Sequence, residues 1–306
     1  MRLTVAICTW NRAPLLRQAL AALAGMVVPR DVAWELVVVD NNSTDDTATV
    51  LAEAAGRLPL RAVFEPTPGK SHALNRAARE ARGEYILWTD DDALVDRQWM
   101  AAYRRAFERW PEAAVFGGRV EPWFAVEPPA WLARSWRTVA SAYAVRDLGD
   151  QPIRLDERVV PYGVNMAVRR AEQLRFRYDP ALGPRPGGSI RGEETALVRE
   201  MLRAGCTGWW IPDARVRHFI PAERHTVRYL RSYYEGDGAV AARRAGNGNG
   251  RRLFGRPLWL WREAVTAELR YRFHRVAAGP ETWLEDLRLA SYLRGRLRGH
   301  GGQAGA

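Results

Sequence analysis

The sequence is poor in cysteine and lacks both a leader-like start and any long apolar run. Its two cysteines, Cys8 and Cys206, are too few for a disulfide framework, so we expect a reducing compartment. Residues 1–10 hold no basic segment followed by an apolar one, so no secretory signal is expected. No stretch approaches roughly 18 uninterrupted apolar residues, which argues against a membrane-spanning helix. The predicted location is therefore the cytoplasm.

Acidic residues are scarce relative to basic ones. The 306-residue chain has 46 lysine and arginine residues against 35 acids, a formal charge of +11. Such a surplus favours phosphate-bearing partners, namely nucleotides, nucleic acids or anionic membranes. Because 47% of the residues are hydrophobic, a large core is expected and global disorder is excluded. The length allows one large or two ordinary domains.

The first 120 residues alternate short apolar runs with helical patterns. Strands are predicted at residues 3–8, 35–40, 60–64, 85–88 and 115–120, and helices after residue 12 and at 44–56, 71–82 and 97–110. This alternation predicts an α/β fold with a doubly wound, mostly parallel sheet and helices on both faces. Polar residues that follow the strands are Thr9, Asp40, Asp90 and Asp92. We expect a ligand site there, because ligands of open α/β sheets bind at the carboxyl ends of the strands.

Three consecutive acids, Asp90, Asp91 and Asp92, end the apolar run 85–88. Adjacent carboxylates repel one another, and a divalent cation such as Mg²⁺ or Mn²⁺ would supply the missing counter-charge. The alternative is a solvated acidic turn in which Asp92 or Asp96 caps the next helix. The convergence of polar residues at several strand ends favours the metal site.

Residues 121–222 are less regular. The segment 121–158, rich in tryptophan, proline and arginine, is predicted to be a loop region that shapes an acceptor pocket. A strand with a glycine kink is expected at 159–168, a mobile loop at 179–191, and short strands at 209–211 and 214–219, the last containing His218. A helix from Gly192 to about Ala204 begins with Glu193 and Glu194 and stops at Gly205. The helix dipole alone favours acids in a first helical turn, so the position of the two glutamates is not by itself a sign of function.

After residue 222 three helical patterns remain, at about 226–244, 257–276 and 281–297, with a flexible connector predicted at 243–252. Residues 251–298 hold 11 arginines against five acids, interleaved with aromatic residues. This pattern is typical of basic amphipathic helices on an anionic membrane surface, here the inner face of the membrane. The alternative is a helical appendage packed on the sheet. Residues 301–306 are predicted to form a disordered tail.

Several ordered motifs within residues 1–220 resemble the family 2 glycosyltransferases. The matching segments are VAICTWNR at 5–12, VDNNSTD at 39–45, GKS at 69–71, ALN at 73–75, the three acids at 90–92, and GVNM at 163–166. The resemblance implies a GT-A catalytic domain over residues 1–222, with a nucleotide-sugar half at 1–120 and an acceptor half at 121–222. Residues 223–300 form the basic helical region.

The resemblance also implies roles for individual residues. Asp90 and Asp92 match the Asp-x-Asp motif that holds Mn²⁺ or Mg²⁺, and His218 resembles a late histidine that completes the metal site in some members. Glu193 and Glu194 stand where the family usually has Glu-Asp, with the second acid as catalytic base, so the pair leaves open which glutamate is the base. Nucleotide-sugar contacts are implied for ten residues: Thr9, Asn11, Arg12, Asp40, Asn42, Lys70, Asn75, Asp90, Asp91 and Asn165.

The roles implied for these residues are consistent with a metal-dependent, inverting glycosyltransferase. Such an enzyme moves a sugar from a nucleoside-diphosphate sugar to a hydroxyl acceptor, and the donor expected here is UDP-linked. A divalent ion neutralises the leaving diphosphate, and a separate carboxylate takes the acceptor proton. The expected acceptor is a carbohydrate, a lipid-linked molecule or a small molecule, and no nucleic acid is expected as a partner.

Four other interpretations compete with this prediction. A phosphate-binding Walker A loop is rejected, because Phe64 stands where its first glycine is required. A sugar-nucleotide nucleotidyltransferase usually shows a glycine-rich basic loop after the first strand, which Thr9 to Arg12 lack. A nucleic-acid-binding protein would account for the charge, but the arginines are dispersed and no recognition motif is present. A non-catalytic sugar-nucleotide-binding protein stays open because of the Glu-Glu pair.

Overall fold

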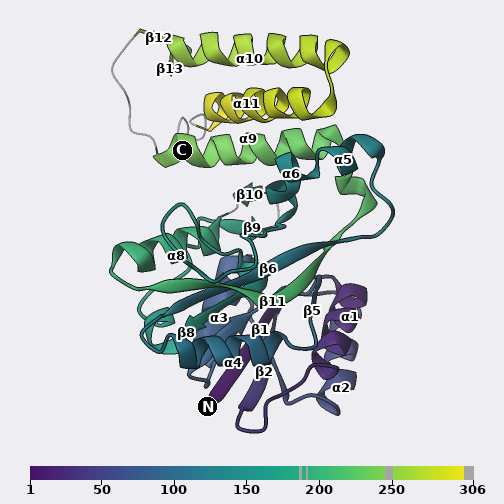
Figure 1. Cartoon of the computed structure of the whole chain (residues 1–306), viewed down its shortest axis with the longest axis vertical. Helices are drawn as coiled ribbons and strands as arrows, with labels where there is room; N and C mark the ends of the chain where they lie inside the picture. The colour runs from purple at the N-terminus through teal and green to yellow at the C-terminus, as the bar shows by residue number, and fades with distance from the viewer. Residues whose placement is uncertain (186–187, 191, 245–250, 300–306) are drawn as a thin grey trace. The chain divides into compact units, whose positions relative to one another are not determined.

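The computed structural model describes residues 1–185, 188–190, 192–244 and 251–299 and divides the chain into two compact units (Figure 1). Unit 1 comprises residues 1–123 and 144–219, and unit 2 comprises residues 124–143 and 220–306. The 301–306 tail and most of the 243–252 connector lie outside the described residues.

The helices and short helical turns of unit 1 surround a nine-stranded sheet. The strands are β1 (Arg2–Thr9), β2 (Ala33–Asp40), β3 (Leu60–Phe64), β4 (Tyr85–Trp88), β5 (Ala93–Val95), β6 (Val115–Phe124), β7 (Ile153–Arg154), β8 (Met166–Arg169) and β11 (Gly208–Ile220). The helices are α1 (Ala13–Ala24), α2 (Thr47–Ala55), α3 (Lys70–Glu80), α4 (Trp99–Arg109), α7 (Arg170–Gln173) and α8 (Glu193–Arg203), with a 3-10 turn η2 (Gly163–Asn165). A small separate hairpin pairs β9 (Gly183–Arg185) with β10 (Gly188–Ile190).

The sheet is mixed, with the order β3-β2-β1-β4-β8-β6-β11-β5, and β7 pairs with β11. The β3-β2-β1-β4 half is parallel throughout, as the βα alternation predicts. Strand β8 then enters antiparallel between β4 and β6, so β6 runs in the direction of β4 without touching it. The register places Thr9 of β1 beside Asp40 of β2, and their carboxyl ends lie at one edge.

Helices cover both faces of this sheet. Leu3, Val5 and Ile7 of β1 point to one face, where α1, α2 and α4 supply the facing core residues. Ala6 of the same strand points to the other face, which α3 and α8 cover. Side chains alternate across a strand, so burial of successive residues on both faces explains the near-continuous apolar strands of the sequence.

Four predicted elements need correction. Residues 121–158 are not wholly irregular, because Leu132 and Val139 are fully buried and anchor short helices. The strand expected at 159–168 begins only at Met166, after η2. The two strands expected around Pro212 form one strand, β11. Part of the loop expected at 179–191 pairs as the β9-β10 hairpin, while residues 186, 187 and 191 lie outside the described residues.

Unit 2 is helical. It contains α5 (Ala130–Arg134), α6 (Trp136–Val139), α9 (Val227–Arg244), α10 (Leu258–Ala277) and α11 (Pro280–Arg298), the 3-10 turns η1 (Ala140–Tyr143) and η3 (Ala222–Arg224), and a short β12 (Arg252–Leu253) to β13 (Arg256–Pro257) pairing. Helix α11 packs against both α9 and α10. At Gly295 an added Cβ would lie 2.0 Å from the Glu235 carbonyl oxygen, so glycine allows the close approach of α11 to α9.

Candidate active site

The three acids after β4 are held by two cations of the chain itself. Arg12, in the turn after β1, places Nη1 3.1 Å from Oδ1 of Asp91 and 2.7 Å from Oδ2 of Asp92. The Thr9 hydroxyl donates a hydrogen bond to Oδ2 of Asp91 at 2.8 Å. Because Asp91 is buried, and because Asp92 is charged beside it, the pKa of Asp91 is raised to about 6.

Lys70, the single lysine of the sequence, joins these acids to the glutamate pair. It is the first residue of α3, and its Nζ lies 3.1 Å from Oδ1 of Asp90 and 2.8 Å from Oε1 of Glu194. Oε1 of Glu193 is 3.9 Å away. One ammonium group therefore faces three carboxylates that come from segments more than 100 residues apart. Lys70 therefore links the end of β4 to the glutamate pair that opens α8.

Glu193 and Glu194 open helix α8, and their environments differ. Burial and the neighbouring charge of Glu194 raise the pKa of Glu193 to about 8, so it holds a proton at neutral pH. Burial also acts to raise the pKa of Glu194, but Lys70 outweighs it, and the pKa of Glu194 is lowered. Glu194 is thus the charged member of the pair.

Gly163 leaves the space that Glu194 occupies. A Cβ added at this glycine would lie 2.5 Å from Cγ and 2.6 Å from Oε1 of Glu194, well inside van der Waals contact. The motif at 163–166 therefore contributes to the site through a missing side chain, a role that the sequence pattern did not reveal.

His218 approaches the acids from the opposite strand. The antiparallel register of β11 and β5 pairs His218 with Ala93, directly after Asp92. Its Nε2 lies 3.5 Å from Oδ1 of Asp92, and both side chains are buried.

Two residues expected to contact the donor make side-chain hydrogen bonds within the chain. The Asn165 side chain is completely buried, accepts hydrogen bonds from Trp99 and Tyr103, and donates two to backbone carbonyls. All of its hydrogen-bonding capacity is used, so the amide cannot bind a ligand. Asn75 likewise bonds the backbone of Tyr178 with both ends of its amide.

Three others shape the loops at the strand ends. Asn11 adopts a left-handed backbone conformation, with a φ of 53°, and its side-chain oxygen accepts a hydrogen bond from the Thr44 amide. Asn42 donates to the carbonyls of Glu65 and Pro66, which fixes the segment before Lys70. Asp40 accepts a hydrogen bond from the Ser43 amide. Their contacts with a nucleotide stay predictions.

Asn41, which the sequence did not single out, makes the stronger loop contacts. Its side-chain amide donates to the carbonyls of Glu65 and Thr67, and its oxygen accepts a bond from the Gly69 amide. Gly69 has a φ of 129°, which a glycine adopts without strain. Asn41 thereby sets the position from which Lys70 enters the site. Asparagine is common in turns, so its sequence signal was weak.

The carboxylates of Asp90 and Asp92 fit Mn²⁺ or Mg²⁺, which prefer oxygen ligands, and His218 would add one imidazole nitrogen beside them. In the structure, however, Arg12 and Lys70 supply the counter-charge of the aspartates, which the sequence led us to expect from a metal ion. In the described parts of the chain, no three His, Cys, Asp or Glu side chains are arranged as a metal-binding group. A divalent ion would have to replace the contact of Arg12 with Asp92 and that of Lys70 with Asp90.

Comparison with known proteins identifies the family of this chain. The family model described as "Glycosyl transferase family 2" matches residues 4–170, more than half of the chain. The chain belongs to glycosyltransferase family 2. Membership in this family confirms the resemblance found in the motifs, and it makes the chain a glycosyltransferase rather than a nucleotidyltransferase or a nucleic-acid-binding protein.

Two relatives illustrate the similarity at the level of sequence. Succinoglycan biosynthesis protein ExoM of Rhizobium meliloti (strain 1021) is 24% identical over 235 residues, which cover 75% of this chain and 71% of that protein. Validoxylamine A glucosyltransferase of Streptomyces hygroscopicus subsp. jinggangensis (strain 5008) is 30% identical over 159 residues, covering 51% of this chain and 37% of that enzyme.

Solved structures of low identity share the fold. The mannosyltransferase PcManGT of Pyrobaculum calidifontis, in complex with GDP-Man and Mn²⁺, matches with a TM-score of 0.63 at 21% identity, over 99% of this chain and 88% of that one. S. aureus TarS in complex with UDP-GlcNAc matches with a TM-score of 0.53 at 14% identity, over 97% and 91% of the two chains. The family 2 chain therefore has the GT-A fold, a mixed, mostly parallel sheet with helices around it.

Proposed function

We propose that this family 2 enzyme is a metal-dependent, inverting glycosyltransferase that uses a nucleoside-diphosphate sugar and a hydroxyl acceptor. One observation carries the proposal: the Lys70 ammonium contacts Asp90 and Glu194 at 3.1 and 2.8 Å, so the acids near the expected diphosphate and the expected base belong to one site. Asp90, Asp92 and His218 would hold Mn²⁺ or Mg²⁺, which as a Lewis acid neutralises charge on the leaving diphosphate.

The remaining chemistry falls to the chain's own residues. Arg12 and Lys70 are cations beside the acids, and they suit the negative charge of a diphosphate. The charged Glu194 accepts the proton of the acceptor hydroxyl as the oxygen bonds to the anomeric carbon. The bond between that carbon and the diphosphate oxygen breaks in the same step, its electron pair leaves with the diphosphate, and the anomeric configuration inverts.

Solved neighbours support a nucleotide-sugar donor for this chain. The two solved neighbours hold GDP-Man and UDP-GlcNAc, so both nucleotides occur on this fold. We propose a UDP-linked donor, and a carbohydrate, lipid-linked or small-molecule acceptor.

A screen of UDP-, GDP- and dTDP-sugars for release of free nucleotide tests the proposal. We expect release from a UDP-sugar that depends on Mn²⁺ or Mg²⁺ and stops when the metal is chelated. Release that is undiminished in a chelator would contradict the metal dependence. Release from GDP-sugars alone would contradict the donor assignment, and release of a product with retained configuration would contradict the single displacement.

A further inference from the structure

Most of the net positive charge of the chain lies in unit 2. Residues 124–143 and 220–306 contain 18 arginines against nine acids, so this third of the sequence carries nine of the eleven net charges. The glycosyltransferase sheet of unit 1 is close to neutral by comparison. A protein that binds its donor in unit 1 has no need of such a surplus in its helical part.

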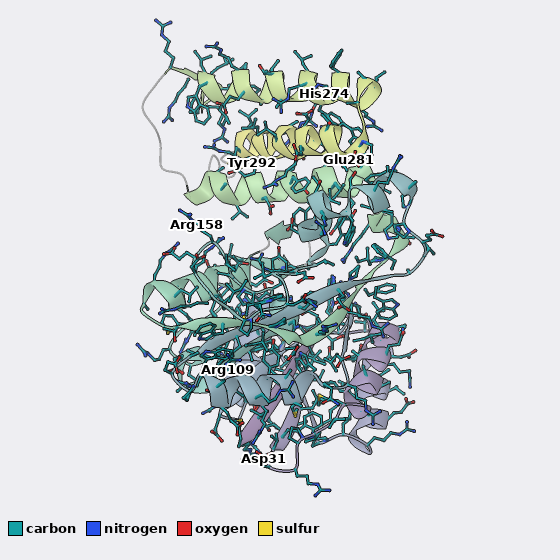
Figure 2. All side chains as sticks on the ribbon, in the orientation of Figure 1. Asp31, Arg109, Arg158, His274, Glu281 and Tyr292 are labelled. Atoms are coloured by element: carbon teal, nitrogen blue, oxygen red, sulfur yellow. The ribbon has the colours of Figure 1, made fainter. Side chains whose placement is uncertain are left out.

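Several acids of unit 2 are used inside the helical bundle. Glu268 of α10 pairs with Arg231 of α9 at 3.0 Å and with Arg294 of α11 at 3.4 Å. Asp286 of α11 pairs with His274 of α10 at 2.6 Å, and Figure 2 shows His274 on α10 beside α11. Asp286 also pairs with Arg270 of α10 at 2.5 Å. Both acids thus neutralise arginines between the helices, so the surplus of positive charge is carried by the other arginines of the unit.

Helix α10 has a second apolar face that does not contact α11. Its buried side is formed by Leu260, Ala267 and Tyr271. About half a turn away, large apolar side chains are exposed along the whole helix. These residues and their exposed fractions are Leu258 (37%), Val265 (56%), Leu269 (62%), Phe273 (67%) and Val276 (91%). We name these five residues the outer face of α10.

Arginine is the only charged residue type within this stripe. Arg262 and Arg272 are exposed and lie on the outer face at helical spacing from Val265 and Leu269. Arg262 makes none of the described ion pairs, and Arg272 pairs with Glu268 at 3.1 Å. Glu263 and Glu268 lie outside the stripe by helical spacing. Just before α10, Phe254 is 85% exposed. The outer face therefore combines large exposed apolar side chains with neighbouring arginines and contains no acid.

We propose that the outer face of α10 binds an anionic membrane surface, with the helix lying parallel to the bilayer. An apolar stripe flanked by arginine is the composition of helices that lie in the headgroup region. In the described residues, no helix is long and apolar enough to cross a bilayer. Anionic headgroups complement the arginine surplus. A second copy of the chain would instead bring the two arginine-bearing faces together across a symmetric interface.

Vesicle sedimentation of the full chain tests the proposal directly. With phosphatidylcholine vesicles that contain 30% phosphatidylglycerol at low salt, we expect a partition coefficient at least about tenfold higher than with phosphatidylcholine alone. In 1 M salt this preference should disappear. Equal binding to neutral and anionic vesicles at low salt would overturn the proposal.

Two matched variants separate the outer face from general surface effects. Leu269→Glu should lower partition onto anionic vesicles by about tenfold or more, because a charge replaces an inserted side chain. Leu174→Glu makes the same change at an exposed leucine of unit 1 and should leave partition unchanged. Arg262→Gln should lower partition by about fivefold on anionic vesicles only.

Equal losses in the Leu269→Glu and Leu174→Glu variants would contradict the assignment of the surface. So would light scattering that shows a dimer of the wild type which Leu269→Glu dissociates. Nucleotide release without vesicles should be the same in all three variants and the wild type, which verifies folding. Failure of this proposal leaves the proposed reaction untouched, since that reaction depends on unit 1.

Discussion

Removal of the single lysine should destabilise the protein in a way that depends on pH. In Lys70→Met, the partners Asp90, Glu193 and Glu194 lose their shared cation while the rest of the site stays in place. The side chains of Lys70 and Asp90 are 23% exposed, Glu194 is 15% exposed and Glu193 is 3% exposed, so water compensates little of the loss. We therefore expect a substantial loss of stability.

The size of the effect follows from the cost of breaking a buried ion pair, which is about 3–5 kcal/mol. Partial exposure of Lys70 places the expected loss at the lower end, about 3 kcal/mol. For a domain of 150–250 residues this corresponds to a fall in Tm of about 6–12 °C. The charged Glu194 provides the pH dependence. Its folded pKa is lowered, so its contribution is present above the ordinary value of 4.5 and is lost as the pH falls through the folded pKa.

Urea unfolding of wild type and Lys70→Met at pH 8 and pH 5 measures the effect. Both pH values lie above 4.5, so wild-type Glu194 is charged at each of them. In Lys70→Met burial acts on Glu194 without the opposing cation, so Glu194 takes up a proton towards pH 5, and the difference in unfolding free energy should be smaller there. Arg104→Met is the matched control, since Arg104 pairs with the exposed Asp31 and Glu108 and should cost less than about 1 kcal/mol. A Lys70→Met loss as small as that of the control, or equal at both pH values, would refute the electrostatic reasoning.

Four further variants test the roles within the site. Glu194→Gln should keep UDP binding and lower kcat by about 10²–10⁴. Glu193→Gln imitates the protonated acid, so its kcat should stay within a fewfold of the wild-type value. Steady-state kinetics that show the reverse order would make Glu193 the base. Gly163→Ala should lower kcat by about 10²-fold at unchanged UDP affinity, and an unaltered kcat would contradict the steric role. Arg12→Met should tighten Mn²⁺ binding without nucleotide about tenfold in electron paramagnetic resonance titrations; unchanged affinity would show that Arg12 does not compete with the metal.

The parallel half of the sheet was predictable from sequence, because buried parallel strands and the helices between them leave a clear alternation. The strands expected at 60–64 and 85–88 have those bounds in the structure. The insertion of β8 between β4 and β6 was not predictable. It pairs residues more than 40 positions apart in the sequence, and no local period records such a pairing.

Within the site, the sequence identified the acids but not what holds them. The three aspartates suggested a metal because no counter-charge was visible nearby in the sequence. In space, Arg12 and Lys70 come from two other segments and provide that charge. Asn165 illustrates the converse, since a motif position expected to face a ligand has every hydrogen bond satisfied within the core. Burial decides whether a polar residue of a motif faces a ligand or is bonded within the core, and burial follows from tertiary packing.

The most direct test of the account is isothermal titration of UDP with and without Mn²⁺ to the wild type, Asp92→Asn and Asp96→Asn. Asp96 is an exposed acid of the same segment and serves as the control. We predict that Mn²⁺ strengthens UDP binding in the wild type and Asp96→Asn, and has no effect in Asp92→Asn. Metal-dependent binding and turnover that persist undiminished in Asp92→Asn would contradict the claim that these acids form the metal-diphosphate site.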